Sequence, residues 1–118
     1  MLNLKKTLTK IMNSLTQTTI INQKSFTASS IDTWVAVESF QLSKPKLVKA
    51  TSTYTLRTVG LGFASSSSVS SAPDYGYIES ENHIYQSPAF MLPAGTIYLY
   101  AKVKSTNAAN KYSVYSFG

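Results

Sequence analysis

Residues 74–85, DYGYIESENHIY, hold the densest set of side chains in this chain that could do chemistry. A pyranose has an apolar C–H face and a polar rim, so saccharide sites typically pair an aromatic platform with carboxylate and amide hydrogen bonds. Tyrosine supplies such a rigid, amphipathic contact at low entropy cost. We therefore predict a saccharide site formed by Asp74, Tyr75, Tyr77, Glu79, Asn82, His83 and Tyr85. The alternative is that these tyrosines cover a sheet edge or a contact between subunits.

Catalysis has little support in the sequence. A Ser-His-Asp arrangement would have to use His83, the single histidine, and none of the many serines stands in a G-x-S-x-G motif. Glycoside hydrolysis needs two carboxylates held apart in a cleft, and nothing in the pattern favours a pairing of Glu38 with Glu79 or Glu81. We expect a protein that is not an enzyme.

Metal and cofactor sites are not expected either. A chain with one histidine and no cysteine offers no zinc site. The carboxylates of Asp74, Glu79 and Glu81 lie close in sequence, but a calcium loop supplies more oxygen ligands at regular spacing. The pair Gly60-x-Gly62 lacks the third glycine and the following helix of a phosphate loop.

Length and charge restrict the partners. The 118 residues suffice for one compact domain. Residues 1–24 carry four lysines and no acid, whereas the remainder carries seven basic and five acidic residues. A nearly neutral body argues against a nucleic-acid groove across the domain. We also expect no membrane insertion and no secretory signal, because no apolar run is long enough.

The clearest structural element follows the turn at residues 93–95 and alternates strictly between apolar and polar residues. Its apolar side chains fall on one face: Ile97, Leu99, Ala101 and Val103. Its tyrosines and lysines fall on the other: Tyr98, Tyr100, Lys102 and Lys104. This period of two predicts a half-buried antiparallel strand.

Similar patterns predict further strands at residues 33–42, 47–58, 59–63 and 111–117, and an exposed serine-rich loop at residues 64–74. Residues 75–86 have a weak apolar face and predict an edge strand or a second long loop. About seven short strands at hairpin spacing predict a mainly β fold, an antiparallel β-sandwich of the jelly-roll type.

The N-terminal part differs. A stripe of apolar residues predicts a short α-helix over residues 2–16 and a seam for oligomerisation, formed by Leu4, Leu8, Ile11 and Leu15. Two heptads are marginal alone in water, so the helix needs partners. We expect residues 1–24 to form this helix and a linker, and residues 25–118 to form the sandwich domain. Residues 17–31 could also contain a first strand.

Four features carry a resemblance to a known family: Thr33-Trp34 opening a strand, Phe40-x-Leu42 before a turn, R-x-V-G-L-G at residues 57–62, and GTIYLYA at residues 95–101. With them, residues 32–117 resemble the jelly-roll head domains of bacteriophage tail fibres, head fibres and baseplate proteins. Those heads are similar to the trimeric heads of the tumour necrosis factor and complement type. In one departure, Lys44-Pro45-Lys46 replaces the usual glycine of the first turn, which leaves that hairpin's geometry open.

The resemblance implies a homotrimer on the surface of a phage virion. It also implies attachment to other virion proteins through the N-terminal helix and recognition of a host-surface saccharide. Two alternatives remain open at this point. One is a capsid-decorating or adaptor protein without a ligand, and the other is a monomeric carbohydrate-binding module.

Overall fold

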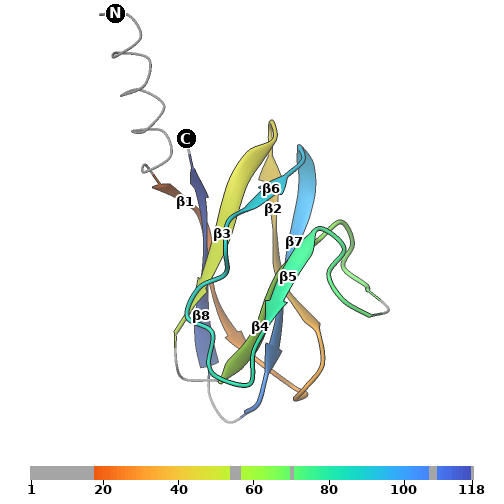
Figure 1. Cartoon of the computed structure of the whole chain (residues 1–118), viewed down its shortest axis with the longest axis vertical. Helices are drawn as coiled ribbons and strands as arrows, with labels where there is room; N and C mark the ends of the chain where they lie inside the picture. Colours follow the sequence, from red (N-terminus) through yellow and green to blue (C-terminus); the bar gives the residue numbers. More distant parts are fainter. Residues whose placement is uncertain (1–17, 54–56, 70, 107–108, 118) are drawn as a thin grey trace, which may run out of the picture.

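The computed structural model describes residues 18–53, 57–69, 71–106 and 109–117. These residues form two four-stranded antiparallel sheets that face each other as a sandwich (Figure 1). The strands are β1 (Thr18–Thr27), β2 (Val35–Leu42), β3 (Lys46–Ser52), β4 (Thr58–Ala64), β5 (Gly76–Glu79), β6 (Phe90–Leu92), β7 (Gly95–Val103) and β8 (Ala109–Phe117). The predicted antiparallel β-sandwich is confirmed, whereas the helix predicted at residues 2–16 lies outside the described residues.

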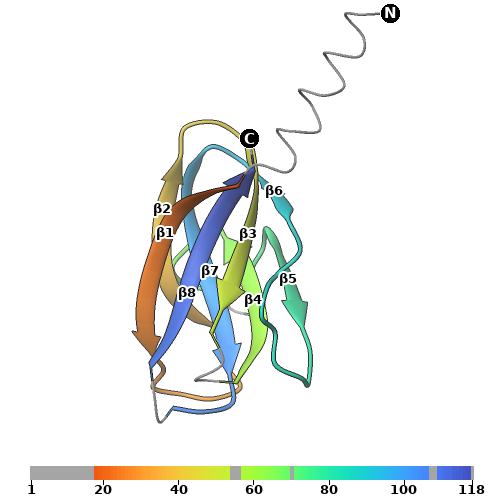
Figure 2. The same cartoon turned by 90° about the vertical axis from the view of Figure 1, so that its left-hand side faces the viewer.

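The strands pair in a nested order. β1 pairs with β8, β2 with β7, β3 with β6, and β4 with β5, so the first half of the chain runs beside the second half in reverse. Two further pairings, β3 with β8 and β4 with β7, join these pairs into the sheets β1-β8-β3-β6 and β2-β7-β4-β5. The first of these sheets faces the viewer in Figure 2.

The core lies between the two sheets and follows the predicted alternation. In β7 the four apolar residues that were assigned to one face are all buried: Ile97, Leu99, Ala101 and Val103. Phe63 of β4 is fully buried at the centre, with its ring 6.0 Å from those of Phe40 and Phe90 in edge-on contacts. Burial of this apolar surface is the main favourable contribution to folding.

The strands differ from the prediction at three points. β1 is the first strand that residues 17–31 were expected to contain, and it includes residues 18–24 of the expected linker; the β-branched run of threonines and isoleucines favours a strand there. β3 ends at Ser52. Residues 90–92 form the short strand β6, which lies at the edge of its sheet beside β3.

Residues 75–86 were predicted as an edge strand or a loop, and they contain both. β5 is the edge strand next to β4, and the residues after it cross to the other sheet. Backbone hydrogen bonds hold this crossing: Ile84 N–H donates to Thr58 O at 2.7 Å, and Ser52 N–H donates to Tyr85 O at 2.8 Å. The crossing segment is therefore fixed to the strands on both sides.

A buried polar cluster lies beneath this crossing. Asn110 Nδ2 donates to Ser52 Oγ at 2.7 Å and to Thr58 Oγ1 at 3.0 Å. Thr58 Oγ1 also lies 3.0 Å from the hydroxyl of Tyr112, which is fully buried. Because buried polar groups are costly unless they are hydrogen-bonded, this network specifies how β3, β4 and β8 meet.

Candidate functional site

The outer face of the sheet β2-β7-β4-β5 brings together side chains from distant parts of the chain. In one row across the strands, Gly60 of β4 pairs with Lys102 of β7 and with Glu79 of β5. In the next row, Gly62 of β4 pairs in the same way with Tyr100 and Tyr77. Directly paired residues project to the same face of a sheet, so each row presents glycine between two larger side chains.

These glycines make room for an aromatic side chain. Trp34 directly precedes β2, and its ring lies against β4: a Cβ atom at Gly60 would stand 2.8 Å from its Cη2 atom. At Gly62 a Cβ atom would meet Gly76 O and Tyr77 Cβ, both at 2.7 Å. Side chains at these two positions would therefore displace the indole ring and the edge strand.

Aromatic and charged groups then surround the indole ring. Its centroid lies 5.6 Å from that of Tyr77 in an edge-on contact, and Lys102 Nζ lies 5.0 Å from the centroid. Lys102 Nζ also forms an ion pair with Glu79 Oε1 at 3.3 Å. Tyr77 is 49% exposed although it belongs to this cluster. We call Trp34, Tyr77, Glu79 and Lys102 the Trp34 platform.

A surface pocket of about 330 Å³ adjoins the platform and shares two of its residues. It is lined by Asp32, Val59, Glu79, Ser80, Glu81, Lys102 and Lys104. Lys104 Nζ pairs with Asp32 Oδ1 at 2.5 Å, and the Arg57 guanidinium donates to the backbone oxygen of Glu81. The site thus combines an aromatic surface with fixed charges of both signs.

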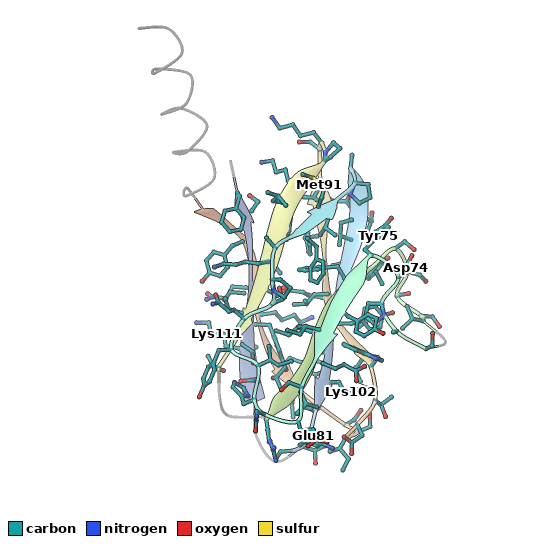
Figure 3. The ribbon with its side chains drawn as sticks, viewed as in Figure 1. Asp74, Tyr75, Glu81, Met91, Lys102 and Lys111 are labelled. Atoms are coloured by element: carbon teal, nitrogen blue, oxygen red, sulfur yellow. The ribbon has the colours of Figure 1, made fainter. Side chains whose placement is uncertain are left out.

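Two of the predicted saccharide-site residues, Tyr77 and Glu79, belong to the platform. Asp74 and Tyr75 lie at the other end of β5, away from Glu81 and Lys102 (Figure 3). Asp74 closes the serine-rich loop, since its carboxylate accepts from Ser65 N–H at 2.9 Å and from Ser65 Oγ at 2.7 Å. These hydrogen bonds hold the pKa of Asp74 below its ordinary value. Tyr75 is half-buried and packs against the core.

The remaining three predicted residues lie in the crossing segment after β5. Asn82 is exposed, and its backbone N–H donates to Ser80 Oγ at 3.1 Å. His83 Nδ1 accepts the backbone N–H of Thr58 at 3.0 Å, and burial together with the nearby Arg57 charge lowers its pKa. Tyr85 is 61% exposed and contacts the His83 ring edge-on, with centroids 4.4 Å apart. The predicted set is therefore divided among three places.

Comparison with known proteins adds little. No protein-family model matches the chain, and no curated protein does. Among solved structures, the chain is similar to one described as a cyanophage Pam1 capsid asymmetric unit. The TM-score is 0.37 and the identity is 9%, over 86% of this chain and 84% of that one. A likeness this weak carries no argument about fold or function.

The sequence interpretation missed two platform residues as site members, Trp34 and Lys102. Both lie outside residues 74–85, and β4 separates Lys102 from β5 in the sheet. The available signal was the pair of glycines in β4 together with Lys102 on the outward face of β7. Glycines in a strand often mark a position where another part of the chain approaches the backbone closely. Periodicity alone does not say which strands are neighbours.

Within the described residues, no group of three or more His, Cys, Asp or Glu side chains could hold a metal ion. The same part of the chain contains no helix long and apolar enough to cross a membrane. The arrangement at the platform is suited to non-covalent recognition, because its groups offer an aromatic surface, hydrogen-bond donors and acceptors.

Proposed function

We propose that this protein is a binding domain of a phage virion, without enzymatic activity, whose jelly-roll sandwich recognises a host-surface saccharide at the Trp34 platform. The observation that carries the proposal is the pair of Trp34 and Tyr77 held beside the Glu79–Lys102 ion pair and the pocket. The nested strand order supports the jelly roll, a fold of eight strands in two Greek keys that occurs in viral capsid and lectin domains.

The chemistry of the platform suits a pyranose. The indole ring offers an apolar surface for the C–H face of a sugar, and half of the Tyr77 side chain remains open to solvent beside it. Glu79 accepts hydrogen bonds and Lys102 donates them, so the hydroxyl groups at the rim of the sugar meet both kinds of partner. The ion pair holds these two side chains in place before a ligand arrives, which reduces the entropy lost on binding.

A non-catalytic role agrees with how the reactive side chains are used. The Nδ1 atom of His83 accepts a backbone hydrogen bond, so it is not free to take a proton from a nucleophile. The Asp74 carboxylate is occupied by Ser65. Both residues hold loops in place.

The virion setting and a homotrimeric assembly follow from the family resemblance. In this proposal Leu4, Leu8, Ile11 and Leu15 form the oligomerisation seam of an N-terminal helix that also attaches the domain to other virion proteins. Light scattering after size exclusion should give a mass near three chains, and Leu8→Asp together with Ile11→Asp should lower it. A mass of one chain would refute both the seam and the trimer.

The saccharide proposal can be tested on an array of bacterial surface glycans. We expect Trp34→Ala and Tyr77→Ala to weaken binding by more than about tenfold, as the loss of an aromatic anchor typically does. Tyr85→Ala is the matched control, because Tyr85 is also exposed but lies off the platform, and it should bind as the native chain does. An array without hits, or hits that respond equally to all three changes, would refute the site.

A second candidate function is a structural virion protein without a ligand, in which the platform contacts another subunit. The exposure of Tyr77 on the platform, 49%, favours it, because aromatic side chains are enriched in contacts between subunits. Under this alternative, Trp34→Ala would lower the mass of the assembly in solution while the native chain bound no glycan.

A further inference from the structure

The two sheets meet at one side through their edge strands β1 and β2, which contact each other there (Figure 2). Lys24 of β1 pairs with Tyr112, a core residue, so it lies on the strand face that turns toward the other sheet, and its side chain is exposed at the edge of the sandwich. In β2 the register shifts between Ala36 and Glu38, and the consecutive residues Val37 and Glu38 are both buried. This contact therefore places the buried carboxyl of Glu38 on β2 near the exposed ammonium group of Lys24 on β1. We call this contact the β1–β2 seam.

Glu38 is the unusual member of the seam. Its side chain is only 7% exposed, and neither carboxylate oxygen has a hydrogen-bond partner among the described residues. Its neighbour in β7 is Leu99, which offers no polar group. From the facing sheet β1 contributes the charge of Lys24, which acts on the carboxyl of Glu38, whereas the Tyr112 hydroxyl of β8 already interacts with Thr58. A charged carboxylate without partners is costly at such a position.

We propose that the β1–β2 seam is a pH-sensitive joint, in which Glu38 stays closed inside the sandwich as a neutral acid and loss of its proton separates the two edge strands. Burial raises the pKa of Glu38, and the charge of Lys24 opposes this rise in part. Opening lets water reach the carboxylate, which then ionises as an ordinary glutamate does. Among the described strands β1 pairs only with β8 and β2 only with β7, so each has an unpaired edge, the kind of surface that pairs with a strand from another chain, and separation of the two strands uncovers these edges.

The sign of the pH effect follows from proton linkage. Below the ordinary pKa of 4.5 the carboxyl is neutral whether the seam is closed or open, so its contribution to the closed state is fully present. As the pH rises through the window between 4.5 and the raised pKa, the open state loses the proton and the closed state keeps it. The opening equilibrium then increases about tenfold for each pH unit within that window. Above the raised pKa it becomes constant.

Hydrogen–deuterium exchange of the full chain, corrected for the intrinsic exchange rate at each pH, measures this opening strand by strand. The amides of β1 and β2 are protected by their pairing with β8 and β7, so opening is detected when either edge strand also leaves its partner. We expect the protection of β1 and β2 to fall with rising pH while that of the inner strand β4 stays constant. Glu38→Gln keeps the shape of the side chain without the titration and should abolish the fall. Lys24→Met removes the charge that favours the carboxylate, so the fall should begin at the same pH and extend to higher pH than in the native chain.

Glu81→Gln is the matched control, since it makes the same chemical change at an exposed carboxylate, and it should behave as the native chain does. A carboxyl ¹³C NMR titration of the native chain provides a second measurement that needs no variant. The proposal is wrong if Glu38 titrates at its ordinary pKa, if Glu38→Gln keeps the native pH dependence, or if β4 loses protection in parallel with the edge strands.

Discussion

Substitution of Gly60 by alanine gives a direct test of how the platform is built. The new methyl group would stand 2.8 Å from Trp34 Cη2 and 3.0 Å from Lys102 Cβ, both closer than van der Waals contact permits. The backbone of β4 is held on both sides by β5 and β7, so the indole ring has to move. We expect Trp34 to swing away from the sheet and to lose its contact with Tyr77.

The magnitude follows from two opposing effects. Crowding of a packed position typically costs about 1–3 kcal/mol. Alanine restricts the unfolded chain more than glycine does, which stabilises the fold by about 0.4–1 kcal/mol. The crowding is the larger effect, so the free energy of unfolding should fall by about 1–2 kcal/mol. In a domain of about 100 residues this lowers Tm by roughly 5–15 °C.

The assay is favourable because Trp34 is the single tryptophan of the chain. Its fluorescence should shift to longer wavelength in Gly60→Ala as the ring becomes exposed to water, and thermal melts should show the lower Tm. Gly62→Ala is a matched comparison: it meets a backbone oxygen and should cost more stability than Gly60→Ala. Unchanged fluorescence and Tm in Gly60→Ala would refute the described packing of Trp34 on β4.

Two further predictions concern stability. Because the pKa of His83 is lowered in the folded state, its contribution to stability is fully present above the ordinary value of 6.5 and is lost as the pH falls below it; His83→Gln should flatten this dependence in urea titrations at pH 5–8. Equal pH dependence in both chains would contradict the prediction. Phe63→Ala removes a fully buried ring and should cost about 3–5 kcal/mol in the same titrations. A loss below about 1 kcal/mol would show that Phe63 is not central to the core.

The sequence predicts where the strands lie better than it predicts which strands are neighbours in a sheet. Alternation identified the inward face of β7, because a half-buried strand repeats every two residues and the apolar residues from Ile97 to Val103 follow that period. It did not predict the burial of Tyr100, which lies on the outward face and is only 2% exposed. The platform could not be derived in the same way. Tyr77 and Trp34 are far apart in sequence, and their contact depends on the order β2-β7-β4-β5, which no local pattern encodes.

Residues 74–85 show that closeness in sequence does not predict closeness in the fold either. Their composition indicated one site. In the structure, however, the Asp74 carboxylate accepts a hydrogen bond from Ser65 N–H in the serine-rich loop, and His83 Nδ1 accepts one from Thr58 N–H. Nearness in sequence placed these side chains together, whereas the turn after β5 sends the second half of the segment to the other sheet. Glu38 was considered only as an acid for hydrolysis, although the alternation of β2 places it on the same face as Phe40 and Leu42, with which it is buried.

The nested pairing also determines when each strand can find its partner while the chain emerges from the ribosome. Gln23 of β1 donates to Ser113 of β8, which lies 90 residues later, so the first strand has no partner in its sheet until almost the whole domain has been synthesised. Only β4 and β5 can pair early, since they are consecutive. Chains dominated by such distant pairings fold slowly, and their unpaired strands can meet those of a neighbouring nascent chain. In the homotrimer that we propose, the same delay would leave β1 unpaired in each copy until β8 has been synthesised.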